Sequence, residues 1–118
     1  MQLFRFDAAV GRALDVFGSQ ALVMSRIGRV DGEVHIGCMH IGAGGIVGYH
    51  QAAVRQLFLV VAGTGWVRGT DTTRQPIAVG QAAYWAQGEW HEAGSQDGMT
   101  AIGIEAATLD PVRDMPAI

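Results

Sequence analysis

The feature that most constrains the fold is a succession of short apolar runs, separated by glycine or polar residues, that begins after Ser19. The runs are ALVMSRI, EVHIGCMHI, GYHQAA, QLFLVVA, GWVRG, PIAV, AAYWA, WHEA and MTAIGIEA. Strands of about four to eight residues bounded by turn signals are typical of all-β sandwiches and barrels. Glycine, at 17 of 118 residues, is about twice as common as the usual ~7% and supplies the turns that such a fold needs. The sequence therefore predicts an all-β fold.

The chain has an ordinary length for one domain, and we predict a single domain over residues 1–118. With 49% hydrophobic and 16% charged residues, it is too apolar for disorder. Its one cysteine, Cys38, excludes a disulfide scaffold. We expect an N-terminal segment over 1–20, a strand-rich core over about 30–106 and an irregular C-terminal tail over 107–118. In the N-terminal segment, Asp7 to Phe17 is predicted to form a short helix or strand, with Asp7 as a helix N-cap.

The charge pattern argues against nucleic acid and membrane partners. The formal net charge is −3, and the eight basic residues are arginines scattered along the sequence without a basic stripe. No uninterrupted apolar run approaches the ~20 residues that span a membrane. Charges also interrupt the apolar N-terminal stretch, so we expect no signal peptide and a cytoplasmic location.

One predicted strand, Gln56–Ala62, is apolar on both of its faces. Phe58 and Val60 share one face, whereas Leu57, Leu59 and Val61 share the other, because successive strand residues point in opposite directions. Such a strand is covered on both sides. We expect the second cover to be either the N-terminal segment or another subunit, which makes a homodimer possible.

The glycine clusters favour structural roles over phosphate binding. Residues 42–45 read Gly-Ala-Gly-Gly, but no helix start follows them, as a phosphate-binding loop requires. Gly63-Thr-Gly65 lies between two apolar runs and is interpreted as a hairpin turn. The sequence also contains no nucleophile elbow, Walker loop or paired-cysteine zinc motif.

Two gapped motifs, in matching order and spacing, resemble the paired motifs of the cupin superfamily. The first reads Gly44-(five residues)-His50-Gln-Ala52-(three residues)-Gln56-(six residues)-Gly63. The second reads Gly80-(five residues)-Ala86-Gln-Gly88-Glu-Trp-His91-(three residues)-Ser95. Between them lie residues 64–79, a separation in the usual range of the family. The chain thus resembles a small single-domain cupin of the type-2 group with a degenerate metal motif.

This resemblance implies a jelly-roll β-barrel whose interior often holds a divalent metal ion. In the family pattern, two histidines on one strand, a carboxylate on the next strand and a third histidine bind the ion. Those positions correspond here to His50, Ala52, Gln56 and His91. Two of the four depart from the pattern, because Ala52 stands at a missing ligand position and Gln56 offers only an amide oxygen.

The departures predict a weak site for iron, manganese, nickel or zinc, held by His50, Gln56 and His91. A divalent ion with these neutral ligands would keep its full charge inside a barrel of low dielectric. Glu105 lies on a late strand, but its parity is opposite to that of Ile102 and Ile104, so we expect it to face outward. The absent imidazole at Ala52 is expected to enlarge the cavity.

Several further residues have a functional and a structural interpretation. His50 and His91 could instead be core histidines bonded to each other, to Gln56 or to buried water. Cys38 is expected to pack as a small hydrophobe, and His35 and His40 are expected at surface or edge positions. The candidate ligand-binding residues are the three candidate metal ligands and three aromatic residues near them: His50, Gln56, His91, Tyr49, Phe58 and Trp90. Of the aromatic residues, Trp90 is expected to form a wall of the pocket.

Three functions are compatible with these observations. The first is a barrel that binds a small molecule and has an eroded or weak metal site. The second is a metal-dependent dioxygenase or isomerase that acts on a small oxygenated metabolite. The third is a non-catalytic dimeric module with a regulatory or structural role. The residues alone do not decide whether the protein is an enzyme.

Overall fold

The structure is a computed structural model that describes all residues from 1 to 118. Ten strands and three short 3₁₀ turns follow one another along the chain: β1 (Gln2–Arg5), η1 (Ala8–Val10), β2 (Arg12–Leu14), η2 (Val16–Gly18), β3 (Leu22–Met24), β4 (His35–Ile41), β5 (Ile46–Gln51), β6 (Gln56–Arg68), β7 (Gln75–Ala78), β8 (Gln81–Trp85), β9 (Trp90–Gly94), β10 (Met99–Glu105) and η3 (Pro111–Arg113). None of these helical turns has the length and apolar character to cross a membrane.

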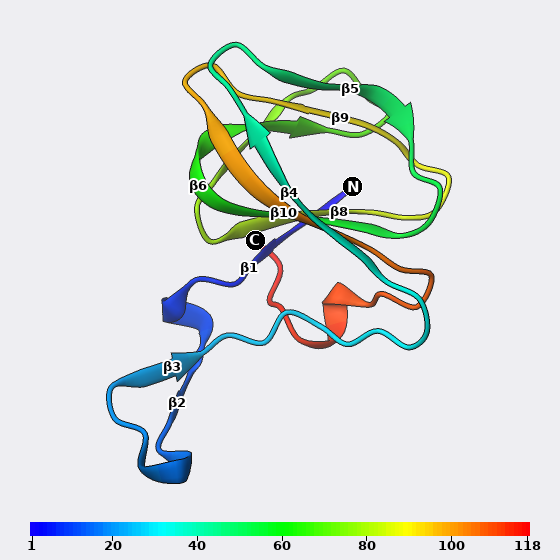
Figure 1. The fold of residues 1–118 in the computed structure, drawn as a ribbon. Coiled ribbons are helices and arrows are strands. Elements are labelled where there is room, and N and C mark those ends of the chain that lie inside the picture. The colour runs from blue at the N-terminus through cyan, green and yellow to red at the C-terminus, as the bar shows by residue number, and fades with distance from the viewer.

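The long strand β6 joins the two walls of an antiparallel barrel (Figure 1). Its first half pairs with β8 and β10, and its second half pairs with β7 and β9. β1 extends the first wall beyond β8, β4 extends it beyond β10, and β5 adds to the second wall beside β9. The all-β barrel predicted from the sequence is therefore confirmed.

The prediction of a hairpin turn at Gly63-Thr-Gly65 is wrong, because these residues continue β6 from one wall into the other. Gly63 has a φ of 76°, and a Cβ atom there would collide with the carbonyl oxygen of Gly98. A Cβ atom on Gly65 would likewise collide with the carbonyl oxygen of Gly94. The glycines serve close packing between strands, a role that local sequence does not distinguish from a turn.

The interior of the barrel is filled by one side of its strands. Phe58 and Val60 of β6 share this core with Trp85 of β8 and with Met99 and Ala101 of β10. All five residues are buried. This arrangement matches the parity expected for β6, in which Phe58 and Val60 face the same way.

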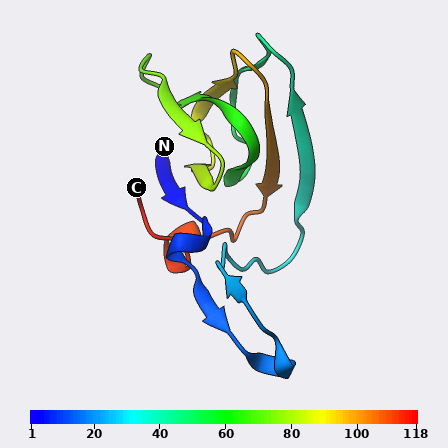
Figure 2. The same ribbon diagram turned by 90° about the vertical axis from the view of Figure 1, so that its left-hand side faces the viewer.

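A second core lies outside the first wall, where the other face of β6 is covered. Leu57 and Leu59 belong to a buried cluster with Phe4 of β1 and with Leu109 and Met115 of the C-terminal segment. The expectation that the N-terminal segment or another subunit covers this face is wrong in part, because the C-terminal segment supplies much of the cover. The C-terminal segment over 107–118 is largely irregular, as expected, but it packs against the barrel beside β1, as Figure 2 also shows.

The segment from η1 to β3, which follows β1, forms an arm that projects away from the barrel (Figures 1 and 2). Asp7 caps a helical turn as predicted, accepting a hydrogen bond from the Ala9 amide, but the helix is limited to η1. From Arg12 the chain is extended and pairs with β3. Gly11 explains the change, because a Cβ atom there would stand 2.6 Å from side-chain atoms of both Val23 and Ser25. The close crossing of the two arm strands therefore requires glycine, which also weakens a helix.

Candidate functional site

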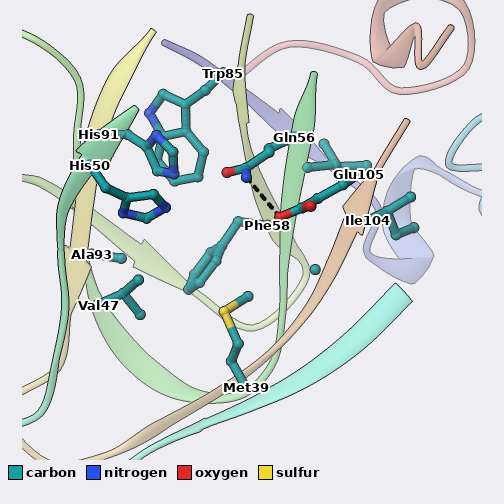
Figure 3. A pocket seen from close by; sticks show the side chains of 12 residues that line it. Met39, Val47, His50, Gln56, Phe58, Trp85, His91, Ala93, Ile104 and Glu105 are labelled. Atoms are coloured by element: carbon teal, nitrogen blue, oxygen red, sulfur yellow. Dashed lines mark hydrogen bonds between the residues drawn. The ribbon is translucent and has the colours of Figure 1, made fainter. Parts of the chain in front are cut away.

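One end of the barrel interior contains a cavity of about 80 Å³ (Figure 3). Its lining is mainly apolar, with residues such as Val47 and Phe58. The polar side chains that line it are His50, Gln56, His91 and Glu105. The volume suits a compound of a few non-hydrogen atoms and lies well below the ~300–1,000 Å³ of pockets for drug-sized ligands.

The two histidines are brought together by the pairing of β5 with β9. His50 and His91 are register partners, and their ring centroids lie 4.3 Å apart. A register shift between Val47 and His50 places two residues of β5, Gly48 and Tyr49, opposite one residue of β9, Glu92. This β-bulge turns both Val47 and His50 toward the cavity, which regular alternation would not allow. His91 is buried at 3% exposure, whereas His50 is exposed.

The His91 ring is also stacked on Trp85 of β8, a residue that neither of the two motifs singles out. The two ring centroids lie 4.3 Å apart with an interplanar angle of 26°. Phe58 packs edge-to-face against Trp85, with the two ring centroids 6.1 Å apart. Stacking between rigid, buried rings fixes the orientation of the His91 imidazole.

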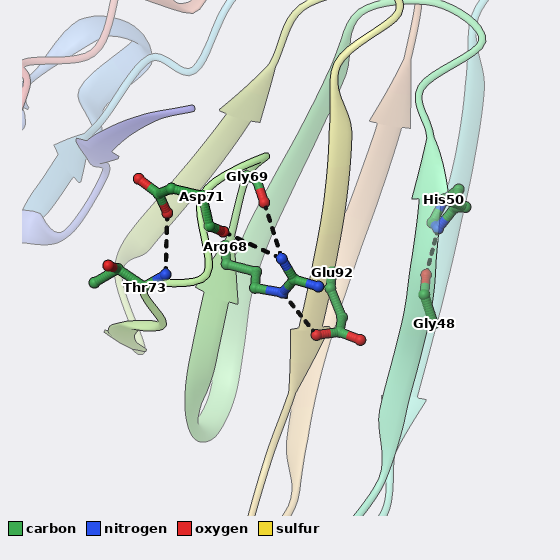
Figure 4. Close-up of polar contacts among 7 residues, drawn as sticks. All are labelled: Gly48, His50, Arg68, Gly69, Asp71, Thr73 and Glu92. Carbon is green, nitrogen blue, oxygen red and sulfur yellow. Dashed lines mark hydrogen bonds and ion pairs between the residues drawn. The ribbon is translucent and has the colours of Figure 1, made fainter.

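Hydrogen bonds to the backbone settle the tautomers of both histidines. His50 Nδ1 lies 2.6 Å from the Gly48 carbonyl oxygen (Figure 4), and His91 Nδ1 lies 3.2 Å from the Glu89 carbonyl oxygen. A carbonyl oxygen only accepts, so Nδ1 must carry the hydrogen in each ring. In the neutral form, Nε2 then has a free lone pair, and neither Nε2 atom has a hydrogen-bond partner in the protein.

Burial lowers the pKa of His91 below its ordinary value of 6.5. The hydrogen bond to the Glu89 carbonyl acts in the opposite direction, and the nearby His50 lowers the pKa further. The charges of Glu89 and Glu105 favour the protonated ring but do not reverse the shift. His91 is therefore a neutral hydrogen-bond acceptor at neutral pH.

The expectation that Glu105 faces outward is wrong. Its Oε1 atom accepts a hydrogen bond of 2.7 Å from Gln56 Nε2, and both residues line the cavity (Figure 3). Ile102 and Ile104 do have the opposite parity, but both pack against the second core outside the barrel, and Ile104 also borders the cavity. The apolar parity of β10 therefore does not mark the barrel interior, because the C-terminal segment gives the outer face of the wall an apolar cover as well.

The cavity residues do not fit a tightly bound metal ion. No group of three or more histidine, cysteine or acidic side chains is placed to hold one ion together. Glu105 is engaged with Gln56 rather than with the histidines. Ala52 is buried but does not line the cavity, so the missing imidazole leaves no added space there. Its backbone instead bonds to Gly88 and Glu89 and holds the turn before β9.

Of the six predicted ligand-binding residues, His50, Gln56, Phe58 and His91 meet at the cavity. Tyr49 and Trp90 are not among its lining residues, so Trp90 does not form a cavity wall. Their rings lie 5.3 Å apart, with exposures of 42% and 41%, and Arg68 packs over Tyr49. Both flank inward-facing histidines and therefore point out of the barrel. Arg68 is held there by Glu92 (Figure 4).

The remaining candidates lie on β4. Cys38 is exposed, so the expectation that it packs as a small hydrophobe is wrong. It shares its outward parity with Ile36 and His40, and no segment covers this part of β4. His35 and His40 are exposed, as predicted.

Comparisons with known proteins show what this barrel is similar to. No protein-family model matches the chain, and no curated protein matches its sequence. Among solved structures, a cupin-like protein from Thermotoga maritima is 17% identical, with a TM-score of 0.60 over 63% of this chain and 57% of its own. A cupin superfamily protein from Desulfitobacterium hafniense is 14% identical, with a TM-score of 0.59 over 80% and 90%. An RmlC-like cupin from Shewanella frigidimarina is 20% identical, with a TM-score of 0.57 over 69% and 68%.

At these identities the likeness concerns the fold. This chain also spans less than two thirds of the length of the Thermotoga maritima protein. The shared architecture, the antiparallel barrel and the order of the two motifs agree with one another. The chain is a small all-β protein with the cupin fold.

Proposed function

We propose that the protein binds a small hydrogen-bond donor, preferably a cationic one, in the barrel cavity. The observation that carries this proposal is the chemistry of the lining. The free polar atoms are His50 Nε2, His91 Nε2, the Gln56 amide oxygen and the second oxygen of Glu105, and all of them accept hydrogen bonds.

Few donors remain to bind an anion in the cavity. The Nδ1–H groups of His50 and His91 are used by backbone carbonyls. The amide of Gln56 donates to Glu105, which leaves one amide hydrogen. Trp85 Nε1 is buried and has no partner, so it is not presented to a ligand. An anionic ligand would therefore meet acceptors and the Glu105 charge in a partly apolar space, which is unfavourable.

The arrangement also supports selectivity for small ligands. The acceptors lie at two sides of the cavity, with the histidines on β5 and β9 and the Gln56–Glu105 pair on β6 and β10 (Figure 3). A ligand with a donor at each end satisfies both sides, while its apolar body contacts Phe58 and Val47.

The test uses methylammonium as the cationic donor and formate as the anionic acceptor, each titrated into the full chain at pH 7.5. Long-range ¹H–¹⁵N spectra follow the Nε2 resonances of His50 and His91. We expect saturable shifts with methylammonium alone. Glu105→Gln should weaken this binding about tenfold, since it removes a charged hydrogen-bond acceptor, whereas Glu33→Gln, at an exposed site, should leave it unchanged.

Two results would overturn the proposal. One is binding of formate as tight as that of methylammonium. The other is one equivalent of iron, manganese, nickel or zinc that survives dialysis and is lost in His50→Ala but kept in the surface variant His40→Ala. The second result would assign the histidines to a metal centre instead.

A further inference from the structure

Four arginines without partners gather where the N-terminal arm meets the C-terminal segment. The other four are each engaged: Arg5 with Asp7, Arg55 with the Leu109 carbonyl, Arg68 with Glu92 and Arg74 with the Trp66 ring. In contrast, no hydrogen bond, ion pair or aromatic contact engages the side chains of Arg12, Arg26, Arg29 and Arg113. Arginines that are scattered in the sequence are thus divided by the fold into a paired and an unpaired group.

Three of the unpaired arginines line one open hollow of about 490 Å³. Arg12 comes from β2, Arg26 follows β3, and Arg113 ends the turn η3. Arg29 lines an adjacent hollow that shares Arg26 with the first. Figure 2 shows η3 beside the base of the arm, so segments from both ends of the chain form this surface.

The protein neutralises the local positive charge only in part, because one acidic residue lines the hollow with three arginines. Asp114 is the acidic residue of the hollow, but it forms no ion pair with any of the arginines. Its Oδ2 atom is buried and has no hydrogen-bond partner. Several unpaired guanidinium groups around one hollow repel one another, and an anion bound between them would relieve that repulsion. The cluster is formed in a chain whose formal net charge is −3.

We propose that this hollow binds a small oxyanion with at least two negative charges, of the phosphate or polycarboxylate class. The planar guanidinium fork matches phosphate and carboxylate oxygens in bidentate geometry, which a single point charge does not. Three guanidinium groups from separate segments can contact several oxygens of a multiply charged anion at once, whereas a monovalent ion offers fewer contacts. The site is separate from the barrel cavity, whose free atoms are acceptors.

The experiment titrates the full chain with citrate and with inorganic phosphate at constant ionic strength, using chloride as the monovalent control. Isothermal calorimetry and the arginine Nε–Hε resonances report binding. We expect saturable binding of citrate or phosphate and no saturation with chloride. Arg26→Gln and Arg113→Gln should each weaken the binding about tenfold, because each removes a charged hydrogen-bond donor.

Controls separate this site from general charge effects and from the barrel cavity. Arg74→Gln removes one positive charge from a residue packed on Trp66, and His50→Ala alters the cavity; neither should change citrate binding. Far-UV circular dichroism confirms that the variants are folded. The proposal would be overturned if Arg74→Gln weakened citrate binding as much as Arg26→Gln does, or if neither citrate nor phosphate gave saturable binding.

Discussion

His91 is held neutral in the folded protein by its surroundings. Burial of the imidazole disfavours a charged ring, and the proximity of His50 adds to this effect. In the unfolded chain the same ring is hydrated and has an ordinary pKa near 6.5. The unfolded state therefore binds more protons than the folded state when the solution becomes mildly acidic.

This difference predicts a pH dependence of stability. The contribution of neutral His91 is fully present above pH ~6.5 and is lost as the pH falls through the lowered pKa of the folded state. We expect the Tm to fall between pH 7.5 and 5, and His91→Phe, which keeps a stacked ring without a titrating group, to reduce that fall. Thermal unfolding at several pH values measures it, with the exposed His35→Gln as control. An unchanged slope in His91→Phe would contradict the assignment.

The residues of the cavity differ in how far the sequence could identify them. The spacing of two motifs identifies His50, Gln56 and His91, and Phe58 enters the candidate set as an aromatic neighbour of Gln56. Glu105 and Trp85 were missed as site residues, since neither belongs to the histidine pattern. Register supplies the signal in the structure: Glu105 is the partner of Gln56 across β6 and β10.

Among the elements, the strands can be predicted from the sequence. Whether a strand ends at a glycine or continues through it cannot. Alternating apolar runs indicate strands because a half-buried strand has a period of two residues. Glycine, however, permits a turn, a bulge or close strand packing. Gly63 was assigned to a turn although it lies inside β6, and the bulge of β5 that orients His50 left no mark that local residue patterns could reveal.

The interpretation of Gly63 can be tested by adding one methyl group. Gly63→Ala places a side chain in the left-handed region at a φ of 76° and against the Gly98 carbonyl. We expect a loss of at least about 2 kcal/mol in the free energy of unfolding, because strain and steric conflict add. Gly37→Ala is the matched control in β4, where a Cβ atom would meet nothing within 4 Å. Urea denaturation measures the free energy of unfolding of both variants. A loss in Gly63→Ala no larger than that in Gly37→Ala would contradict the close packing inferred at Gly63.

At the scale of the whole molecule, the sequence predicted one barrel core and the structure has two apolar layers. The doubly apolar run over 56–62 did predict a second cover. The sequence does not identify the C-terminal segment as this cover, because a short segment with two prolines indicates irregular structure whether or not it packs against the barrel. Leu57 and Leu59 are buried within the single chain, so this part of the strand is not a surface for a second subunit. Only Val61, 44% exposed, is left open on that face.

The C-terminal cover should therefore contribute a measurable part of the stability. Leu109 is 2% exposed and belongs to the outer cluster, whereas Val112, three residues later, is 62% exposed. Leu109→Ala should reduce the free energy of unfolding by about 2–5 kcal/mol, since it removes buried methyl groups and leaves a cavity. Val112→Ala should change it by less than about 0.5 kcal/mol. Chemical denaturation compares the two variants, and similar small effects for both would mean that residues 107–118 do not close the outer core in solution.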